Sequence, residues 1–254
     1  MNKELILTTP SNIPLVKRGD DISRLILNGL RDAAMELRDG DVIVIASKII
    51  SKAEGRAVRL GDVMPSERAL ELAAVTDKDA REIELMLQES SEVVRARQGL
   101  IVTRHRLGFV SANAGIDHSN VAEGAEEFVL MLPIDPDASA EGIRREVERE
   151  TGKQVSVVIA DSHGRPHRLG TIGIAIGCAG MPALEDWRGR QDLFGYELKY
   201  TDIGLADMLA SAATLLFGQA REGTPIVLVR GATWSGKNGT ARDLVRPQEM
   251  DLFP

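Results

Sequence analysis

Three short apolar runs constrain the fold of this chain more than any other feature of its sequence. Val42–Ala46, Val155–Ala160 and Pro225–Val229 consist almost entirely of aliphatic residues and are rich in Val and Ile. Runs of this length and composition are typical of strands that are buried on both faces of a sheet. We therefore expect all three runs to be strands in the core of the protein.

The helices that we expect show apolar residues at helical spacing. Such a period runs from Ile22, behind Asp20 or Asp21 as N-cap, to Leu37, and Gly40 lies just past its end, where glycine commonly closes a helix. Ser66 and Asp77 are the predicted N-caps of the next two helices. The further helices are predicted over Ser66–Val75, Lys78–Ser90, Ser139–Thr151 (closed by Gly152) and Ile203–Phe217.

The remaining strands do not alternate regularly with these helices. Leu5–Thr8 and Thr171–Gly177 read as strands, and Leu100–Thr103 with Leu107–Ala112 reads as a hairpin. Without a strict β-α-β order, an α+β fold with mixed sheets and packed helices is favoured over a doubly wound sheet. Composition marks no boundary within residues 1–254, so we predict a single unit with room for a smaller subdomain in the middle third.

Charge and cysteine usage narrow the class of protein. The formal net charge of −7 disfavours binding to nucleic acid or to an anionic membrane, but it allows a small anionic substrate where positive charge is concentrated. No apolar run approaches the roughly 18 residues that span a bilayer. The first residues carry no signal-peptide pattern, and the single Cys178 fits a reducing compartment. We therefore expect a cytoplasmic protein.

One motif resembles a phosphate-binding P-loop but lacks the physical requirements of one. Residues Gly231 to Lys237 read GATWSGK, behind a predicted strand. Asn238 then stands where the P-loop needs a metal-binding hydroxyl, and Gly239 and Thr240 do not open a helix whose N-terminus could hold phosphate. We interpret this match as accidental.

A second motif has a better physical basis. Asp161 directly follows the predicted strand Val155–Ala160, and the end of a buried strand is a common position for a metal ligand. Arg165 and Arg168 follow among glycines, a combination that suits phosphate oxygens. The histidines show no recognised zinc spacing, so we interpret them as polar loop residues: His105, His118, His163 and His167.

Two further segments follow predicted strands, and each has a functional and an ordinary interpretation. Asn113–Asn120 can present Asp117 and Asn120 to one site, or it can be an Asx-type turn. Ala46–Arg56 carries two lysines and an arginine, which form either an anion-binding loop or a solvated charged face. Together with Asp161, these segments predict a metal–nucleotide site at the ends of three strands.

The chain resembles one family, the coenzyme F420-0:L-glutamate (γ-glutamyl) ligases. The resemblance covers almost the whole chain, in order. The segments that carry it are Ile13–Val16, Ser51–Arg56, Asn113–Asp117 with Ser119 and Asn120, Asp161–Arg165, Ala175–Gly177, Asp186–Arg190, Asp192–Gly195, Phe217–Gln219 and Val229–Gly231.

The resemblance implies a family-specific α+β fold, an intertwined homodimer, and a site for GTP with two divalent cations, Mg²⁺ or Mn²⁺, and room for K⁺. It places one cation on Asp117 and Asp161 and the second on Ser162 and Gln219. It assigns catalysis to Asp117, Asp161 and Arg165. The residues implied to contact GTP are Ile13, Pro14, Leu15, Val16, Ser47, Lys48, Lys52, Asn120, Phe217, Gly218, Gln219, Ala220, Arg221, Glu222, Gly223 and Thr224.

The implied reaction joins L-glutamate to F420-0. GTP would phosphorylate the lactyl carboxylate, the amine of glutamate would attack the acyl phosphate, and a later glutamate would be γ-linked. This route needs no covalent enzyme intermediate, which fits a chain without a convincing Ser-His-Asp or Cys-His arrangement. The protein would hold polyanions together with focused positive charge, for which the candidates are Lys52, Arg56, Arg165 and Arg168.

Two other functions use the same residues. A metal-dependent nucleotide phosphohydrolase would use Asp117 and Asp161 with water as the nucleophile, and it would turn over without glutamate. A regulatory nucleotide-binding protein would bind GTP tightly without turnover.

The two lysine-bearing motifs lead to a first testable prediction. We expect Lys52→Ala to lower kcat/KM for GTP by about tenfold or more, because a charge-assisted contact to phosphate contributes about 1.5–3 kcal/mol. Lys237→Ala, in the P-loop look-alike, should cost far less. Steady-state kinetics with GTP as the varied substrate measure both, and the reverse order of effects would restore the P-loop interpretation.

Overall fold

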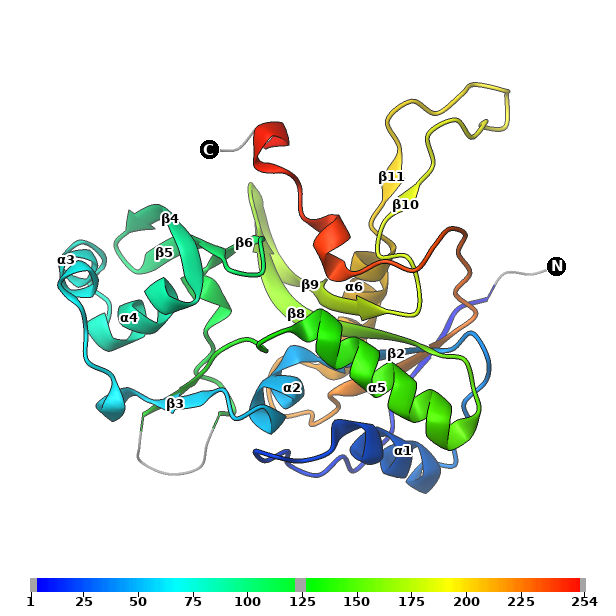
Figure 1. Ribbon diagram of the computed structural model, residues 1–254, viewed down its shortest axis with the longest axis horizontal. Helices are drawn as coiled ribbons and strands as arrows, with labels where there is room; N and C mark the ends of the chain where they lie inside the picture. Colours follow the sequence, from blue (N-terminus) through cyan, green and yellow to red (C-terminus); the bar gives the residue numbers. More distant parts are fainter. Residues whose placement is uncertain (1–3, 122–126, 252–254) are drawn as a thin grey trace.

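A mixed five-stranded sheet forms the centre of the computed structural model, which describes residues 4–121 and 127–251 (Figure 1). Its strand order is β1-β12-β2-β8-β9, where β2 and β8 are parallel and the other neighbours antiparallel. The strands span Ile6–Thr8 (β1), Val42–Ala46 (β2), Ser156–Arg165 (β8), Arg168–Ala179 (β9) and Ile226–Arg230 (β12). The prediction of an α+β fold with mixed sheets is confirmed.

Helices cover both faces of this sheet, as the unbroken apolar runs require. Ile43 and Ile159 point into one core with α1 and α5, whereas Val44 and Val158 point into the other with α6. In Figure 1, α1 and α5 lie in front of the sheet and α6 behind it. The helices are α1 (Ile22–Asp32), the short α2 (Ser47–Ala53), α5 (Pro136–Thr151) and α6 (Leu205–Phe217).

A second, smaller sheet and two helices form a separate cluster, here called the middle unit (residues 60–115), at the left of Figure 1. Its core joins Leu72 of α3, Ile83 of α4 and Ile101 of β5. The elements are α3 (Glu67–Thr76), α4 (Ala80–Gln88), β4 (Ser90–Arg97), β5 (Leu100–His105) and β6 (Val110–Ala112).

Two short strand pairs complete the fold. A two-stranded ribbon connects the middle unit to the large sheet, and another forms the base of an arm that extends away from the molecule (Figure 1). These pairs are β3 (Ala57–Arg59) with β7 (Phe128–Leu130), and β10 (Glu185–Asp186) with β11 (Asp202–Ile203). Within the described residues, no helix is both long enough and apolar enough to cross a bilayer.

The structure corrects several predicted helix boundaries. The first helix ends at Asp32 and not near Leu37, because Ala34 adopts a left-handed conformation with φ of 53°. Asp77, predicted as an N-cap, is instead the left-handed C-cap of α3, and Asp79 caps α4. α5 begins at Pro136, which is favoured in the first turn of a helix.

The strand predictions were too short in two places. Residues 90–97 form β4, which the sequence did not reveal because its side chains are mostly polar and half-exposed. Strand β8 continues as far as Arg165, and β9 begins at Arg168. The segment from Asp161 to Gly170, expected as a loop, is therefore the outer part of a long hairpin. The predicted pairing of Leu100–Thr103 with Leu107–Ala112 is confirmed as the pair β5–β6.

The close approach of α5 to β9 predicts opposite effects for two glycine substitutions. A Cβ on Gly177 would lie 2.4 Å from the carbonyl oxygen of Pro136, whereas Gly142, exposed within α5, has nothing within 4 Å. We expect Gly177→Ala to lower the free energy of unfolding by about 1–3 kcal/mol through overpacking. Gly142→Ala should raise it by about 0.5–1 kcal/mol through helix propensity. Denaturant titration measures both changes, and equal effects would contradict the packing argument.

Candidate active site

Asp161 lies on β8 at the point where the neighbouring strand β2 ends. The β2–β8 pairing ends with Ala46 opposite Ala160, after which β2 turns directly into α2 and β8 continues beside β9 alone. Ser47, the first residue of α2, donates its hydroxyl hydrogen to Oδ1 of Asp161 over 2.6 Å. The sequence placed Asp161 at the end of a buried strand. In the structure the strand continues, but complete burial ends at this residue.

Asp117 follows the middle unit in the chain, and its side chain also contacts α2. Its backbone forms an isolated bridge with Leu130 of β7, and its Oδ2 lies 2.7 Å from Nζ of Lys48 on α2. Its Oδ1 accepts a hydrogen bond from the backbone N–H of Ser119, so the Asx-type turn is also present. Lys48 in addition donates to the hydroxyl and carbonyl of Ser119. The ordinary interpretation therefore holds, and the functional one, in which Asp117 and Asn120 face one site, stays a prediction.

The pKa values of the two carboxyl groups are shifted in opposite directions. Burial raises the pKa of Asp161 to about 6, and the negative charge of Asp117 adds to this, against the hydrogen bond from Ser47. Burial also raises the pKa of Asp117, but the hydrogen bonds from Lys48 and Ser119 outweigh it and leave that pKa lowered. Burial and the charge of Lys48 lower the pKa of Lys52. Lys48 forms its ion pair with Asp117, so the negative charge of Asp161 is only weakly balanced by positive charge.

This donor set fits part of the coordination shell of a hard divalent cation. Carboxylate and hydroxyl oxygens are the ligands that Mg²⁺ and Mn²⁺ prefer, and Mg²⁺ commonly takes one or two carboxylates plus phosphate oxygens. Within residues 4–121 and 127–251, no group of three or more His, Cys, Asp or Glu side chains is placed to hold a metal ion. A cation at Asp117 and Asp161 therefore needs further oxygens from a ligand or from water.

Ser162 and Gln219 meet on the other face of β8. Successive side chains of a strand point to opposite faces, so Ser162 points toward α6 while Asp161 points toward α2. The hydroxyl of Ser162 donates to Oε1 of Gln219, just beyond the end of α6, over 3.4 Å. The structure thus joins the two residues that the resemblance assigns to a second cation, and both offer neutral oxygens.

The predicted nucleotide segment at residues 217–224 lies beside Asn120. The side-chain amide of Asn120 donates to the carbonyl of Ala220 over 2.8 Å, which connects this loop to the chain that carries Asp117. Gly218 has φ of 72°, and a Cβ there would lie 2.2 Å from the Glu222 carboxylate. Ile13–Val16, also predicted to bind GTP, packs through Ile13 and Val16 on the core beneath α1.

The arginines predicted to hold anionic substrates do not lie beside Asp117 and Asp161. Arg165 is four residues along β8 from Asp161, about 13 Å at the usual rise of a strand, and its Nη2 donates to the carbonyl of Leu169. Arg168 pairs with it across the hairpin. Arg56 forms an ion pair with Glu89 instead of facing the site. Positive charge at the carboxylates therefore comes from Lys48 and Lys52.

Some of the sequence predictions about polar residues were wrong. His105, expected on a loop, is 1% exposed in β5, and its ring stacks on Phe109. The segment Ala46–Arg56, interpreted either as an anion-binding loop or as a solvated charged face, is not a loop over Ser47–Ala53, which form helix α2. The rejection of the P-loop is confirmed, because the segment after Gly231 leads only to a short 3-10 helix at Ala241–Leu244.

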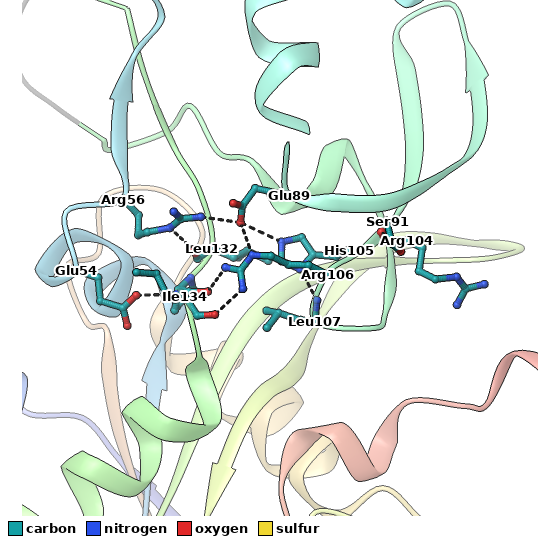
Figure 2. Close-up of polar contacts among 11 residues, drawn as sticks. Glu54, Arg56, Glu89, Ser91, Arg104, His105, Arg106, Leu107, Leu132 and Ile134 are labelled. Carbon is teal, nitrogen blue, oxygen red and sulfur yellow. Dashed lines mark hydrogen bonds and ion pairs between the residues drawn. The ribbon is translucent and has the colours of Figure 1, made fainter. Parts of the chain in front are cut away.

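Sequence reasoning also missed two features. One is a cavity of about 240 Å³ along β9, lined in part by Phe109, Asp207 and Val245; it contains none of the predicted site residues. The other is a cluster of charged side chains around Glu89 (Figure 2). Neither has a local sequence signal, because their residues come from segments far apart in the chain.

Comparison with known proteins identifies the family of this chain. The profile of the family described as F420-0:Gamma-glutamyl ligase matches residues 11–231. Two proteins named coenzyme F420:L-glutamate ligase, from Methanothermobacter thermautotrophicus and Methanocaldococcus jannaschii, are each 46% identical over 95% of this chain and 95% and 94% of theirs. One of the same name from Archaeoglobus fulgidus is 45% identical over 95% of this chain and 93% of its own. The chain belongs to the F420-0:γ-glutamyl ligase family.

The raised pKa of Asp161 leads to a prediction about stability. With a chelator present to remove metal ions, we expect the free energy of unfolding of Asp161→Asn at pH 7.5 to exceed that of the wild type by about 1–3 kcal/mol. The unfolded carboxyl has a pKa near 3.8 and the folded one about 6, so the wild type loses stability as pH rises between these values. Asn keeps the acceptor for Ser47 and carries no charge.

The measurement is denaturant unfolding of both proteins from pH 4 to pH 8. The advantage of Asp161→Asn should grow with pH and level off above about pH 7. A difference that stays constant across this range would show that burial of the charge is not its cause.

Proposed function

We propose that this member of the family is a GTP-dependent ligase that adds L-glutamate first to the lactyl carboxylate of F420-0 and then in γ-linkage, in the biosynthesis of coenzyme F420. The observation that carries the proposal is that two successive residues of α2 contact the two carboxylates: Ser47 is hydrogen-bonded to Asp161, and Lys48 forms an ion pair with Asp117. The names of the relatives support the substrates, since each is called a coenzyme F420:L-glutamate ligase.

The chemistry explains why such a site would need a nucleotide. A carboxylate does not acylate an amine unaided, because its oxygen is a poor leaving group. Transfer of the γ-phosphoryl group of GTP to the lactyl carboxylate gives an acyl phosphate, and attack by the amine of glutamate forms the amide and releases phosphate. The protein contributes positioning and neutralisation of charge, as is general for phosphoryl transfer.

In this proposal Asp117 and Asp161 hold one divalent cation, and Ser162 and Gln219 contact a second. Bound Mg²⁺ or Mn²⁺, with K⁺ as a further ion, supplies charge neutralisation at the phosphates. Lys48 exchanges its ion pair with Asp117 for phosphate oxygens, and Lys52, half-buried beside it, adds a second positive charge. Asn120 positions the loop at residues 217–224, where the nucleotide lies.

We further propose that the protein is a cytoplasmic homodimer. The support comes from large apolar side chains that are almost fully exposed on two projecting segments, the arm beyond β10 and the end of the β8–β9 hairpin (Figure 1). Exposed apolar groups of this size usually mark a contact surface. They are Leu169 (98% exposed), Leu193 (98%), Phe194 (95%) and Tyr200 (91%). The role of Arg165, at the hairpin end, stays a prediction.

The proposal predicts the stoichiometry of the reaction. The enzyme should release one GDP for each glutamate added, and only when F420-0 and glutamate are both present. A labile acyl phosphate must be shielded from water, so its site should be completed by the substrates. The measurement is GDP release with each component omitted in turn, together with mass spectrometry and fragmentation of the product.

Asp117→Ala and Asp161→Ala are the matched variants, and each should abolish turnover while the protein stays folded. Rapid GDP release without glutamate would instead support the phosphohydrolase. Tight GTP binding without any turnover would support a regulatory protein. An α-linked second glutamate would contradict the γ-ligase assignment.

A further inference from the structure

Glu89, the C-cap of α4, gathers three basic side chains in the junction between the middle unit and the large sheet (Figure 2). Its Oε2 lies 2.6 Å from Nη2 of Arg56, 3.0 Å from Nε of Arg106 and 3.6 Å from Nε2 of His105. Glu89 itself is only 8% exposed. Burial raises its pKa, but the basic groups of His105, Arg56 and Arg106 beside it outweigh this and hold the pKa at about 2. The carboxylate is therefore charged throughout the physiological range.

The same arginines bind the return strap, residues 131–135, which leads from β7 to α5. Arg56 donates Nε to the carbonyl of Leu132, and Arg106 donates to the carbonyls of Pro133 and Ile134 (Figure 2). From the large-sheet side, Glu54 accepts hydrogen bonds from the N–H of Ile134 and the hydroxyl of Ser139. Glu89, Arg56, Arg106 and Glu54 together form a polar network, here called the Glu89 joint. It links α4, the end of α2, the strap and the start of α5.

This joint leads directly to Asp117. The carbonyl of Arg56 accepts a hydrogen bond from Met131, and the next residue, Ala57, pairs with Leu130. Leu130 in turn forms the two backbone hydrogen bonds of its bridge with Asp117, at 3.0 and 2.8 Å. Two ties therefore hold Asp117 near α2: its own ion pair with Lys48, and the backbone path that the Glu89 joint anchors.

We propose that Glu89 is a positioning residue that keeps Asp117 in register with Asp161 when the Lys48–Asp117 ion pair opens. This inference rests on the proposed function, in which Lys48 moves to phosphate and Asp117 to a cation. At that moment the direct tie across the site is lost. The Glu89 joint remains, because Arg56 and Arg106 are held by Glu89 and by backbone carbonyls of the strap, which are not part of the proposed metal site. Partners that orient metal ligands from a distance typically change metal affinity by about 10–100-fold when they are removed.

The test compares Glu89→Gln with Glu92→Gln in the full-length protein. Glu92 belongs to the same unit and pairs with Arg104 at 3.4 Å, but its side chain is 51% exposed. We expect Glu89→Gln to raise the dissociation constant for Mn²⁺, measured by electron paramagnetic resonance with GDP present, by about tenfold. Glu92→Gln should bind Mn²⁺ like the wild type. At saturating Mn²⁺, kcat of Glu89→Gln should stay within about twofold of the wild type.

Thermal melting separates this role from a purely structural one. A Glu89→Gln protein that melts earlier, but whose folded fraction binds Mn²⁺ with wild-type affinity, would overturn the proposal. If this variant does not fold, Arg106→Lys decides, because it keeps a charge beside Glu89 and loses bonds to the strap; unchanged Mn²⁺ affinity there would also overturn it. Asp117→Asn serves as the reference. Wild-type Mn²⁺ affinity in Asp117→Asn would mean that the proposed metal site itself is wrong, independently of Glu89.

Discussion

The parallel pairing of β2 with β8 is the interaction on which the rest of this structure depends. The two strands are buried on both faces and pair from Val42 with Ser156 to Ala46 with Ala160. Because the two strands run in the same direction, their pairing ends at one position along the sheet. The residues that follow it in the two strands, Ser47 and Asp161, therefore lie side by side. Their hydrogen bond of 2.6 Å follows directly from that register. A slip by one residue would place Asp161 on the face of α6 instead.

The second carboxylate depends on tertiary structure over a longer distance. Asp117 belongs to the connection between the middle unit and β7, and its side chain reaches Lys48 only because the middle unit is held against the large sheet. The buried charges around Glu89 hold that junction. Such a network is strongly destabilised when one partner is removed, since the remaining charges stay buried without compensation. The geometry of the site therefore depends on residues that never contact it.

The sequence predicted those features that local patterns determine. β2 has the predicted limits, Asp21 and Ser66 cap the starts of α1 and α3, and Gly152 closes α5, because apolar runs and capping chemistry act over a few residues. Strand β4 and the extension of β8 were missed, because their polar side chains resemble those of a loop and only pairing with a neighbour makes them strands. The candidate site residues stood out as separate motifs that together predicted one site, but no pattern could show which side chains contact each other, such as Ser47 with Asp161.

The alternation of side chains along β8 limits how one ligand could use the whole site. Asp161 and Ser162 point to opposite faces of the strand, toward α2 and toward α6. A single polyphosphate that is bound through cations on both residues cannot pass through the sheet. In the proposed function it would pass around the edge of β8 beyond Ala160, where the pairing with β2 has ended. Lys48, on α2 beside that edge, and the loop at residues 217–224, which follows α6, then lie on its two sides. Within the described residues, the early end of β2 thus accounts for the position of Asp161 and leaves an unpaired stretch of β8, along which a nucleotide could extend toward the Ser162–Gln219 pair in the proposed function.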